Sequence, residues 1–193
     1  MSRVKEDNDR FIRNARLIGI GLAALFVLRY FLTWDEADTW TLLDDIDLAI
    51  HEAGHMVFMP FGEFIMVLGG SLFQLIVPAV FVGYFARQKQ WYSACFIMLW
   101  LGQSCFNVSY YIADARAREL PLITGDPSTH DWTWLLIQMD LLERDRSIGH
   151  VVRSIGALLC IGGVAGAVKA ALYREPEPLR SFVRTTPFET GIK

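Results

Sequence analysis

The sequence predicts an all-α, polytopic membrane protein of four to five helices, with a helix that carries a His-Glu-x-x-His motif at its core. Of its 193 residues, 53% are hydrophobic and 20% are charged, and the mean hydropathy is +0.30. Several apolar runs reach the length of a membrane-spanning helix, which is typical of integral membrane proteins. The length fits one domain. We divide it into a basic segment (1–16), a membrane domain (17–173) and a polar tail (174–193).

The first helix is expected over the apolar run 17–34, directly after the basic segment. This run can span a membrane if Arg29 extends its charged end to the interface, where Tyr30 and Trp34 would also lie. Cations before a first span favour a cytoplasmic N-terminus, and we expect a plasma membrane protein, of the bacterial inner membrane. No small-residue cleavage site follows the run, so no cleavable signal peptide is expected.

The second helix carries the motif and follows an acidic link, 35–47. The stretch Thr41-Leu-Leu-Asp44 has the pattern of a capping box, and acidic residues favour the positive end of a helix dipole. Apolar residues continue to about Met59. Pro60 and Gly62 then end the helix.

The motif consists of His51, Glu52 and His55. Helix positions four residues apart share a face, so both imidazoles can reach one zinc ion. Zinc lowers the pKa of a bound water to about 7, and Glu52 could then take the proton as general base. Apolar flanks would bury these groups, and burial without a partner costs several kcal/mol, which favours a metal over coincidence. Asp47, one turn earlier, either holds the second ring nitrogen of His51 or only supports the helix dipole.

Composition and periodicity predict the structure of three segments after the motif. Residues 64–70 favour a short hairpin or re-entrant strand near the metal, because they include β-branched residues and end in two glycines. A membrane helix follows over 71–85, and a third apolar run, 91–113, contains the polar Asn107.

The remaining chain begins with a loop that is rich in turn-forming residues, 119–131. Residues 132–143 read as an amphipathic, interfacial helix that Asp131 would cap. A last membrane helix contains Gly162-x-x-x-Gly166, a spacing that suits packing against another helix, including one of a partner. The membrane domain therefore has a core, an interfacial part and a last helix, at 42–118, 119–148 and 149–173.

Two topologies are open. If the motif helix is a full span, Arg87 and Lys89 fall on the outer side of the membrane. If it is re-entrant, they and the C-terminal tail fall on the cytoplasmic side, which agrees better with the positive-inside rule.

Other functional classes find little support. The three cysteines lie in apolar runs without metal-binding spacing and read as small buried hydrophobic residues. The basic residues are scattered and no nucleic-acid motif is present, so we expect the lipid bilayer, and not nucleic acid, as the surroundings of this chain.

A catalytic zinc usually has three protein ligands, and the motif supplies two. Asp114 is the first candidate for the third, because it ends a helix that could pack against the motif helix. His130 or Asp131 is the alternative, as an adjacent pair on a loop with little structural need for either.

The motif, the stretch Gly69-Gly70-Ser-Leu-Phe-Gln74 and the pair Asn107 and Asp114 resemble, in order and approximate spacing, the site-2-protease-like membrane metallopeptidases. The resemblance covers about residues 42–118. It implies one zinc ion, peptide cleavage in or near the membrane with Glu52 as general base, Asp114 as the third ligand, and contact of Asn107 with substrate.

We therefore expect a zinc metallopeptidase that hydrolyses peptide bonds of membrane or membrane-proximal proteins. One alternative is a non-catalytic membrane protein with a structural metal site. Another is a membrane scaffold or assembly partner in which the motif is accidental. Removal of the Glu52 carboxylate distinguishes the metallopeptidase from the protein with a structural metal site, because only the enzyme needs a general base.

Overall fold

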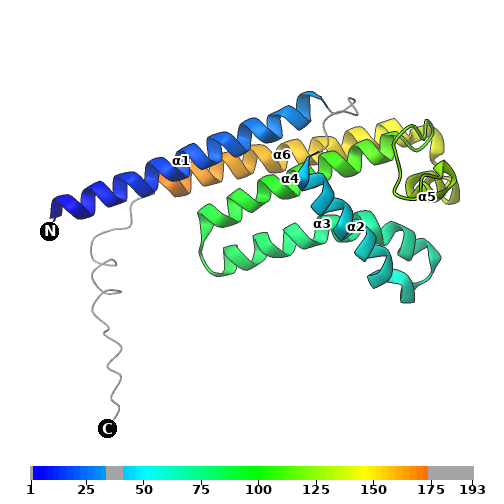
Figure 1. Cartoon of the computed structure of the whole chain (residues 1–193), viewed down its shortest axis with the longest axis horizontal. Coiled ribbons are helices and arrows are strands. Elements are labelled where there is room, and N and C mark those ends of the chain that lie inside the picture. The colour runs from blue at the N-terminus through cyan, green and yellow to red at the C-terminus, as the bar shows by residue number, and fades with distance from the viewer. Residues whose placement is uncertain (1, 34–40, 174–193) are drawn as a thin grey trace, which may run out of the picture.

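The computed structural model describes residues 2–33 and 41–173, and it confirms the all-α prediction for this part of the chain (Figure 1). The polar tail and the first part of the acidic link, residues 35–40, lie outside the described residues. Three 3-10 turns connect longer helices, at Met59–Phe61, Pro127–Thr129 and Leu142–Arg144. The six α-helices are α1 (Ser2–Leu32), α2 (Leu42–Phe58), α3 (Glu63–Arg87), α4 (Trp91–Ala113), α5 (Asp131–Gln138) and α6 (Asp145–Leu172).

Three of these helices are long and apolar enough to cross a membrane, at Glu6–Leu32, Glu63–Arg87 and Leu142–Leu172. This number is compatible with a membrane protein and is smaller than the four to five membrane helices expected from the sequence. Helix α2 has only 17 residues. Helix α4 is long enough, but polar residues such as Gln103 and Asn107 lower its hydropathy.

The hairpin or strand expected at 64–70 is wrong, because these residues form the first turns of α3. Gly62, the residue just before α3, has a φ of 93° and interrupts the helical backbone there. Glycine adopts this conformation at little cost. Gly69 is buried against α2, where a Cβ would lie 2.6 Å from the Cβ of Phe58. The paired glycines therefore permit close contact between two helices, and do not mark a turn.

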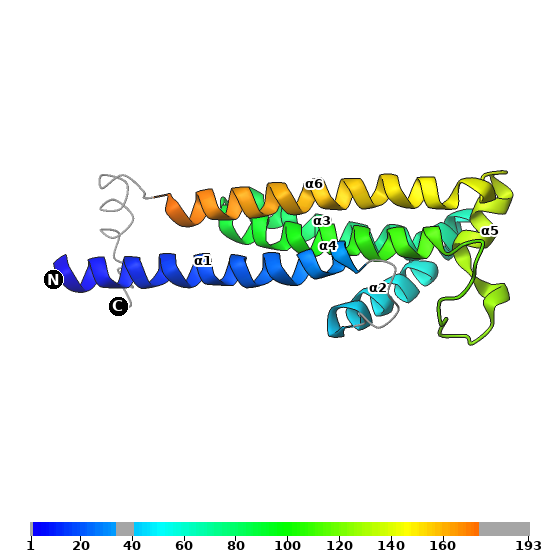
Figure 2. The ribbon, with the colours of Figure 1, turned by 90° about the horizontal axis from the view of Figure 1, so that it is seen from above.

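The turn between α3 and α4 lies beside α1 and the end of α6, away from α5 (Figure 2). The hydroxyl of Tyr92, near the start of α4, donates a hydrogen bond of 2.8 Å to the carbonyl of Arg16 in α1. Helix α2 is short and crosses the long helices obliquely (Figure 2). The basic α3–α4 turn and the N-terminal part of α1 therefore lie at the same end of the helix bundle.

Helices α4 and α6 pack closely through small residues. Gly149, Gly156 and Gly163 recur every seven residues on α6, and an added Cβ at each would come within 2.9 Å of the backbone of α4. Gly166 also packs inside the chain, where a Cβ would lie 2.5 Å from Cys95 Sγ, whereas Gly162 is exposed. The seven-residue glycine series, more than the predicted Gly162–Gly166 pair, thus forms the internal helix contact.

Candidate metal centre

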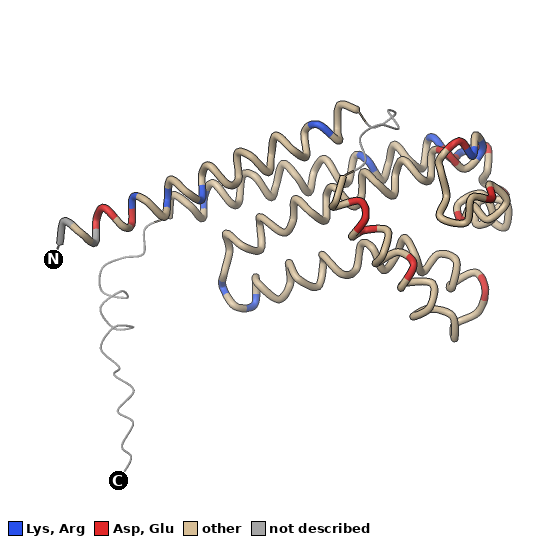
Figure 3. Tube along the Cα trace, in the orientation of Figure 1, with Lys and Arg blue, Asp and Glu red and all other residues tan. Residues whose placement is uncertain are grey.

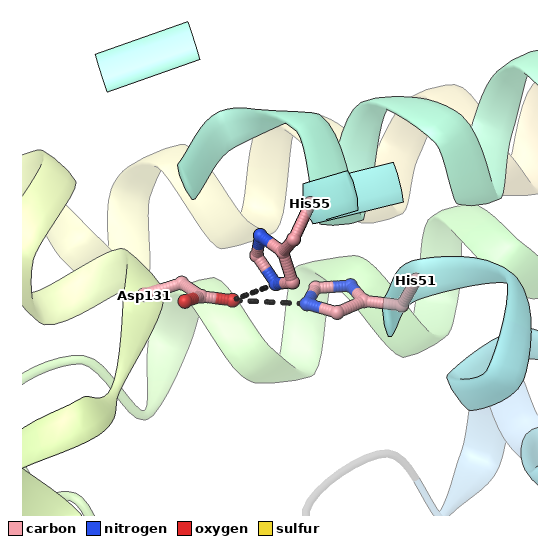
Figure 4. A group of neighbouring side chains, drawn as sticks. All are labelled: His51, His55 and Asp131. Atoms are coloured by element: carbon pink, nitrogen blue, oxygen red, sulfur yellow. Dashed lines mark hydrogen bonds and ion pairs between the residues drawn. The ribbon is translucent and has the colours of Figure 1, made fainter. Parts of the chain in front are cut away.

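Three side chains from two helices meet at the motif: His51 and His55 of α2 and Asp131, the first residue of α5 (Figure 4). Asp131 Oδ2 lies 2.9 Å from His51 Nε2 and 3.2 Å from His55 Nε2. One potential ligand atom from each residue lies within 4.8 Å of the others. Two imidazole nitrogens and one carboxylate oxygen, with a further position open, are the donor set of many catalytic zinc sites. The residues present therefore fit a zinc ion.

Helix α3 holds the two imidazoles in this arrangement. His55 Nδ1 donates a hydrogen bond of 2.9 Å to the carbonyl oxygen of Met66, so Nε2 is the nitrogen left for a metal. Gly70 passes close to both rings: a Cβ there would lie 2.5 Å from His51 Nε2 and 2.7 Å from His55 Nε2. Glycine at this position keeps the space beside both ligand nitrogens open.

Helices α4 and α3 position Asp131. Its backbone N–H donates a hydrogen bond of 3.1 Å to the hydroxyl oxygen of Tyr111 in α4, and the Tyr111 ring meets His51 edge to face at 5.8 Å. The next residue, Trp132, donates from Nε1 to Ser71 Oγ in α3 at 3.0 Å. Residues far apart in sequence thus fix the carboxylate opposite the two histidines.

The three groups form a charged, hydrogen-bonded cluster. The hydrogen bond with Asp131 raises the pKa of His55 to about 9, although burial acts in the opposite direction. Burial alone would raise the pKa of Asp131, but the hydrogen bonds from His51 and His55 outweigh it and hold this pKa below its ordinary value. A divalent cation binds neutral imidazoles, so its binding here would release the proton that the raised pKa favours on His55.

Asp114, the first candidate for the third ligand, lies at the end of α4 and not beside the two histidines. Its Oδ1 accepts a hydrogen bond of 3.1 Å from the N–H of Glu119, and its Oδ2 accepts one of 3.1 Å from the N–H of Leu120. The carboxylate thus fixes the start of the loop that leads to α5. Asp131, named as an alternative, is the carboxylate that the structure brings to the motif.

His130, the other alternative, caps α5. Its Nδ1 accepts a hydrogen bond of 3.2 Å from the N–H of Thr133, and its Nε2 lies 3.3 Å from Asp114 Oδ2. The expectation that Asp131 caps this helix is therefore wrong: Asp131 is its first residue. The interfacial helix is also shorter than expected and ends at Gln138.

Asp47 points to α4 and not to the second nitrogen of His51. Asp47 Oδ1 accepts a hydrogen bond of 2.8 Å from Trp100 Nε1, and Oδ2 accepts one of 3.2 Å from Ser104 Oγ. Asp47 is fully buried, so these donors replace water around its carboxylate. Its observed contacts join the motif helix to α4.

A polar cluster around Asp44 was only partly visible in the sequence. The predicted capping box is confirmed, because the Thr41 N–H donates to Asp44 Oδ2 at 2.8 Å. The same carboxylate also accepts hydrogen bonds from Tyr30 of α1 and from Asn107 of α4, the latter at 3.1 Å. Asn107 in turn accepts from Gln74 Nε2 of α3 at 2.9 Å. No local sequence signal joins these four helices.

A cavity of about 420 Å³ opens beside the metal ligands. Glu52 is exposed and lines it together with the two histidines and Asp131. Asn107 also lines the cavity, as does the loop segment 120–124. Most of the wall is apolar, and none of the described lining residues is Lys or Arg.

Comparisons with protein-family models, with curated proteins and with solved structures find no match for this chain. The resemblance to site-2-protease-like metallopeptidases therefore stays a prediction, and the chemistry of the cavity has to be argued from the residues that line it.

Proposed function

We propose that this chain is a membrane-embedded zinc metallopeptidase that cleaves peptide bonds in membrane or membrane-proximal proteins. The observation that carries the proposal is the approach of Asp131 to His51 and His55 at 2.9 and 3.2 Å, on the wall of a cavity that also contains Glu52. Structural zinc sites are closed by four protein ligands. Three candidate ligands beside an open cavity instead favour a site that admits water and substrate.

The residues have distinct roles in this proposal. A bound zinc ion would supply Lewis acidity, which polarises a carbonyl and lowers the pKa of a coordinated water to about 7. Glu52 follows the first ligand in the sequence and faces the same cavity, so its carboxylate would accept the proton of the attacking water and pass it to the leaving amine. His51, His55 and Asp131 hold the metal, and the His55–Met66 hydrogen bond keeps one ring in orientation.

The cavity favours an internal, apolar stretch of polypeptide as substrate. Leu48, Val67 and Phe106 contribute apolar wall, and loop residues 120–123 also line the cavity. A peptidase that recognises a free C-terminus needs a cation for the carboxylate, and the described lining contains no Lys or Arg. Asp44, the remaining lining acid, already accepts hydrogen bonds from Tyr30, Thr41 and Asn107 and is not free to bind a substrate amine.

The test compares wild type with Glu52→Gln. Each protein is incubated with zinc and reconstituted into liposomes together with a panel of synthetic single-span peptides. We expect both proteins to hold close to one zinc per chain, and only wild type to release fragments that mass spectrometry detects. Glu63→Gln is the matched control, because Glu63 is exposed at the start of α3 and does not line the cavity. Cleavage by Glu52→Gln at the wild-type rate would remove Glu52 from the mechanism, and absence of zinc from wild type would refute the proposal as a whole.

A further inference from the structure

A second cavity, of about 900 Å³, lies on the side of the molecule away from α5. Three separate segments supply a basic residue to its wall: Arg16 from α1, Lys89 from the α3–α4 turn and Lys169 from the last turns of α6. Figure 3 shows basic residues at this turn and on the N-terminal half of α1. None of the described lining residues is acidic, so the cavity concentrates positive charge.

Aromatic side chains line the same cavity as these cations. The Arg16 guanidinium lies 5.2 Å from the centre of the Tyr92 ring, a cation–π distance. The Tyr92 hydroxyl also binds the Arg16 carbonyl, so α1 and α4 are joined here. Trp91 and Tyr173 also line the cavity and are 58% and 66% exposed. Trp and Tyr beside Lys and Arg are the residue types found at the boundary between hydrocarbon and lipid headgroups.

The apolar parts of three helices begin or end close in sequence to residues that line the cavity. The first apolar run starts at Leu17, directly after Arg16, and the candidate spans of α3 and α6 end at Arg87 and Leu172. Exposed apolar side chains, including Ile18 and Leu172, continue from the cavity along the helices. Acyl chains could pack against this surface, whereas a soluble anion would make no use of it.

Lys89 occupies a backbone conformation that side chains rarely adopt. It follows the last turn of α3 with a φ of 58°, and its N–H donates to the carbonyl of Ala86 at 3.0 Å. Glycine is the usual residue at this position of a helix end, because it has no Cβ to strain the left-handed conformation. A lysine here places a cation at the cavity in spite of that strain.

From these observations we propose that the cavity lined by Arg16, Lys89 and Lys169 binds the phosphate of an anionic phospholipid of the surrounding bilayer. The three cations would surround the phosphate, Trp91 and Tyr173 would lie at headgroup depth, and the acyl chains would follow the apolar helix surfaces. Anionic headgroups attract basic residues near a membrane surface, and each cation contributes about fivefold in affinity, so three give roughly 100-fold.

The test measures binding of dioctanoyl phosphatidylglycerol to the full-length protein in a neutral detergent, with dioctanoyl phosphatidylcholine as the uncharged comparison. We expect wild type to prefer phosphatidylglycerol, and the combined variant Arg16→Gln, Lys89→Gln and Lys169→Gln to lose roughly 100-fold in affinity for it. The charge-matched control is Arg118→Gln with Arg144→Gln and Arg146→Gln, which removes three exposed cations outside this cavity. It should retain the preference.

A single substitution guards against misfolding of the combined variant. Lys89→Gly removes one cation and relieves the left-handed strain, so the thermal midpoint should stay or rise while phosphatidylglycerol affinity falls about fivefold. Unchanged affinity in Lys89→Gly and in the combined variant would overturn the proposal. So would an equal loss in the control variant, or full displacement of the lipid by inorganic phosphate, which would mark a site for a soluble anion.

Discussion

Gly70→Ala should weaken metal binding strongly while leaving most of the fold intact. Normal contact between a methyl carbon and a ring nitrogen is about 3.4 Å or more. The new Cβ would lie 2.5 Å from His51 Nε2 and 2.7 Å from His55 Nε2. Both rings must therefore move by roughly 0.7–0.9 Å, judged against that contact distance. The atoms that meet the methyl group are side-chain ends, which can rotate away, so we expect a loss of about 1–3 kcal/mol in unfolding free energy, as for other overpacked sites.

The effect on zinc should be much larger than the effect on stability. Disturbing the group that orients one ligand already costs about 10- to 100-fold in affinity, and here two ligand nitrogens are displaced together, so we expect a loss of about 100-fold or more. At a free zinc concentration 100 times the wild-type Kd, zinc stabilises the native state by about 2.7 kcal/mol. A Kd raised 100-fold reduces this to about 0.4 kcal/mol at the same zinc concentration.

The assay is thermal unfolding of detergent-purified protein with and without zinc, together with a competitive zinc titration. Gly83→Ala in the same helix is the control, because an added Cβ there meets nothing within 4 Å and should stabilise the helix slightly in both conditions. Gly54→Ala gives a contrasting result: its Cβ would overlap the backbone of Gly69, so stability should fall even without zinc. Wild-type zinc affinity in Gly70→Ala would refute the assignment of both Nε2 atoms as ligands.

Three further substitutions test which carboxylate binds the metal and what positions it. Asp131→Asn should weaken zinc binding by about 100-fold or more, because one anionic ligand is lost. Asp114→Asn should keep zinc and lower the unfolding free energy by about 1–3 kcal/mol, because its hydrogen bonds to the loop and its contact with His130 weaken. Equal zinc loss in both variants would contradict the structure. Tyr111→Phe removes the acceptor for the Asp131 N–H and should weaken zinc binding by about fivefold. This corresponds to the net contribution of one hydrogen bond, about 1 kcal/mol. An unchanged Kd for zinc would show that this contact does not position Asp131.

The sequence was sufficient to predict those features of the fold and of the site that depend on local periodicity. The four-residue spacing of His51 and His55 predicts that the two imidazoles share a helix face, and the structure has them on one face of α2. The capping box at Thr41 and Asp44 is likewise a local pattern, and it is confirmed. The apolar runs predict helices, although the first begins at Ser2 and includes the basic segment, since no glycine or proline interrupts it before Gly19.

The remaining features depend on contacts that no local pattern contains. Asp47 lies four residues before His51, the same spacing that separates His51 from His55, so spacing alone cannot tell which partner its carboxylate takes. Trp100 and Ser104 of α4 donate hydrogen bonds to it, and these donors come from a helix that is distant in the sequence. The sequence identified Asp131 only as one of two adjacent candidates on a loop, because nothing local distinguishes the roles of the two residues. In the structure His130 caps α5, and Asp131 contacts the motif histidines.

The distance along the chain between the ligands has a consequence for stability. His51 and Asp131 are 80 residues apart, so a metal bound to both would close a very long loop. A covalent cross-link of that span lowers the entropy of the unfolded chain by an amount worth about 4–5 kcal/mol, and a metal approaches this limit as long as it stays bound. Zinc would then act as a reversible cross-link between the motif helix and the short α5. Chelation should release α5 and its loop from the helix bundle before the long helices separate.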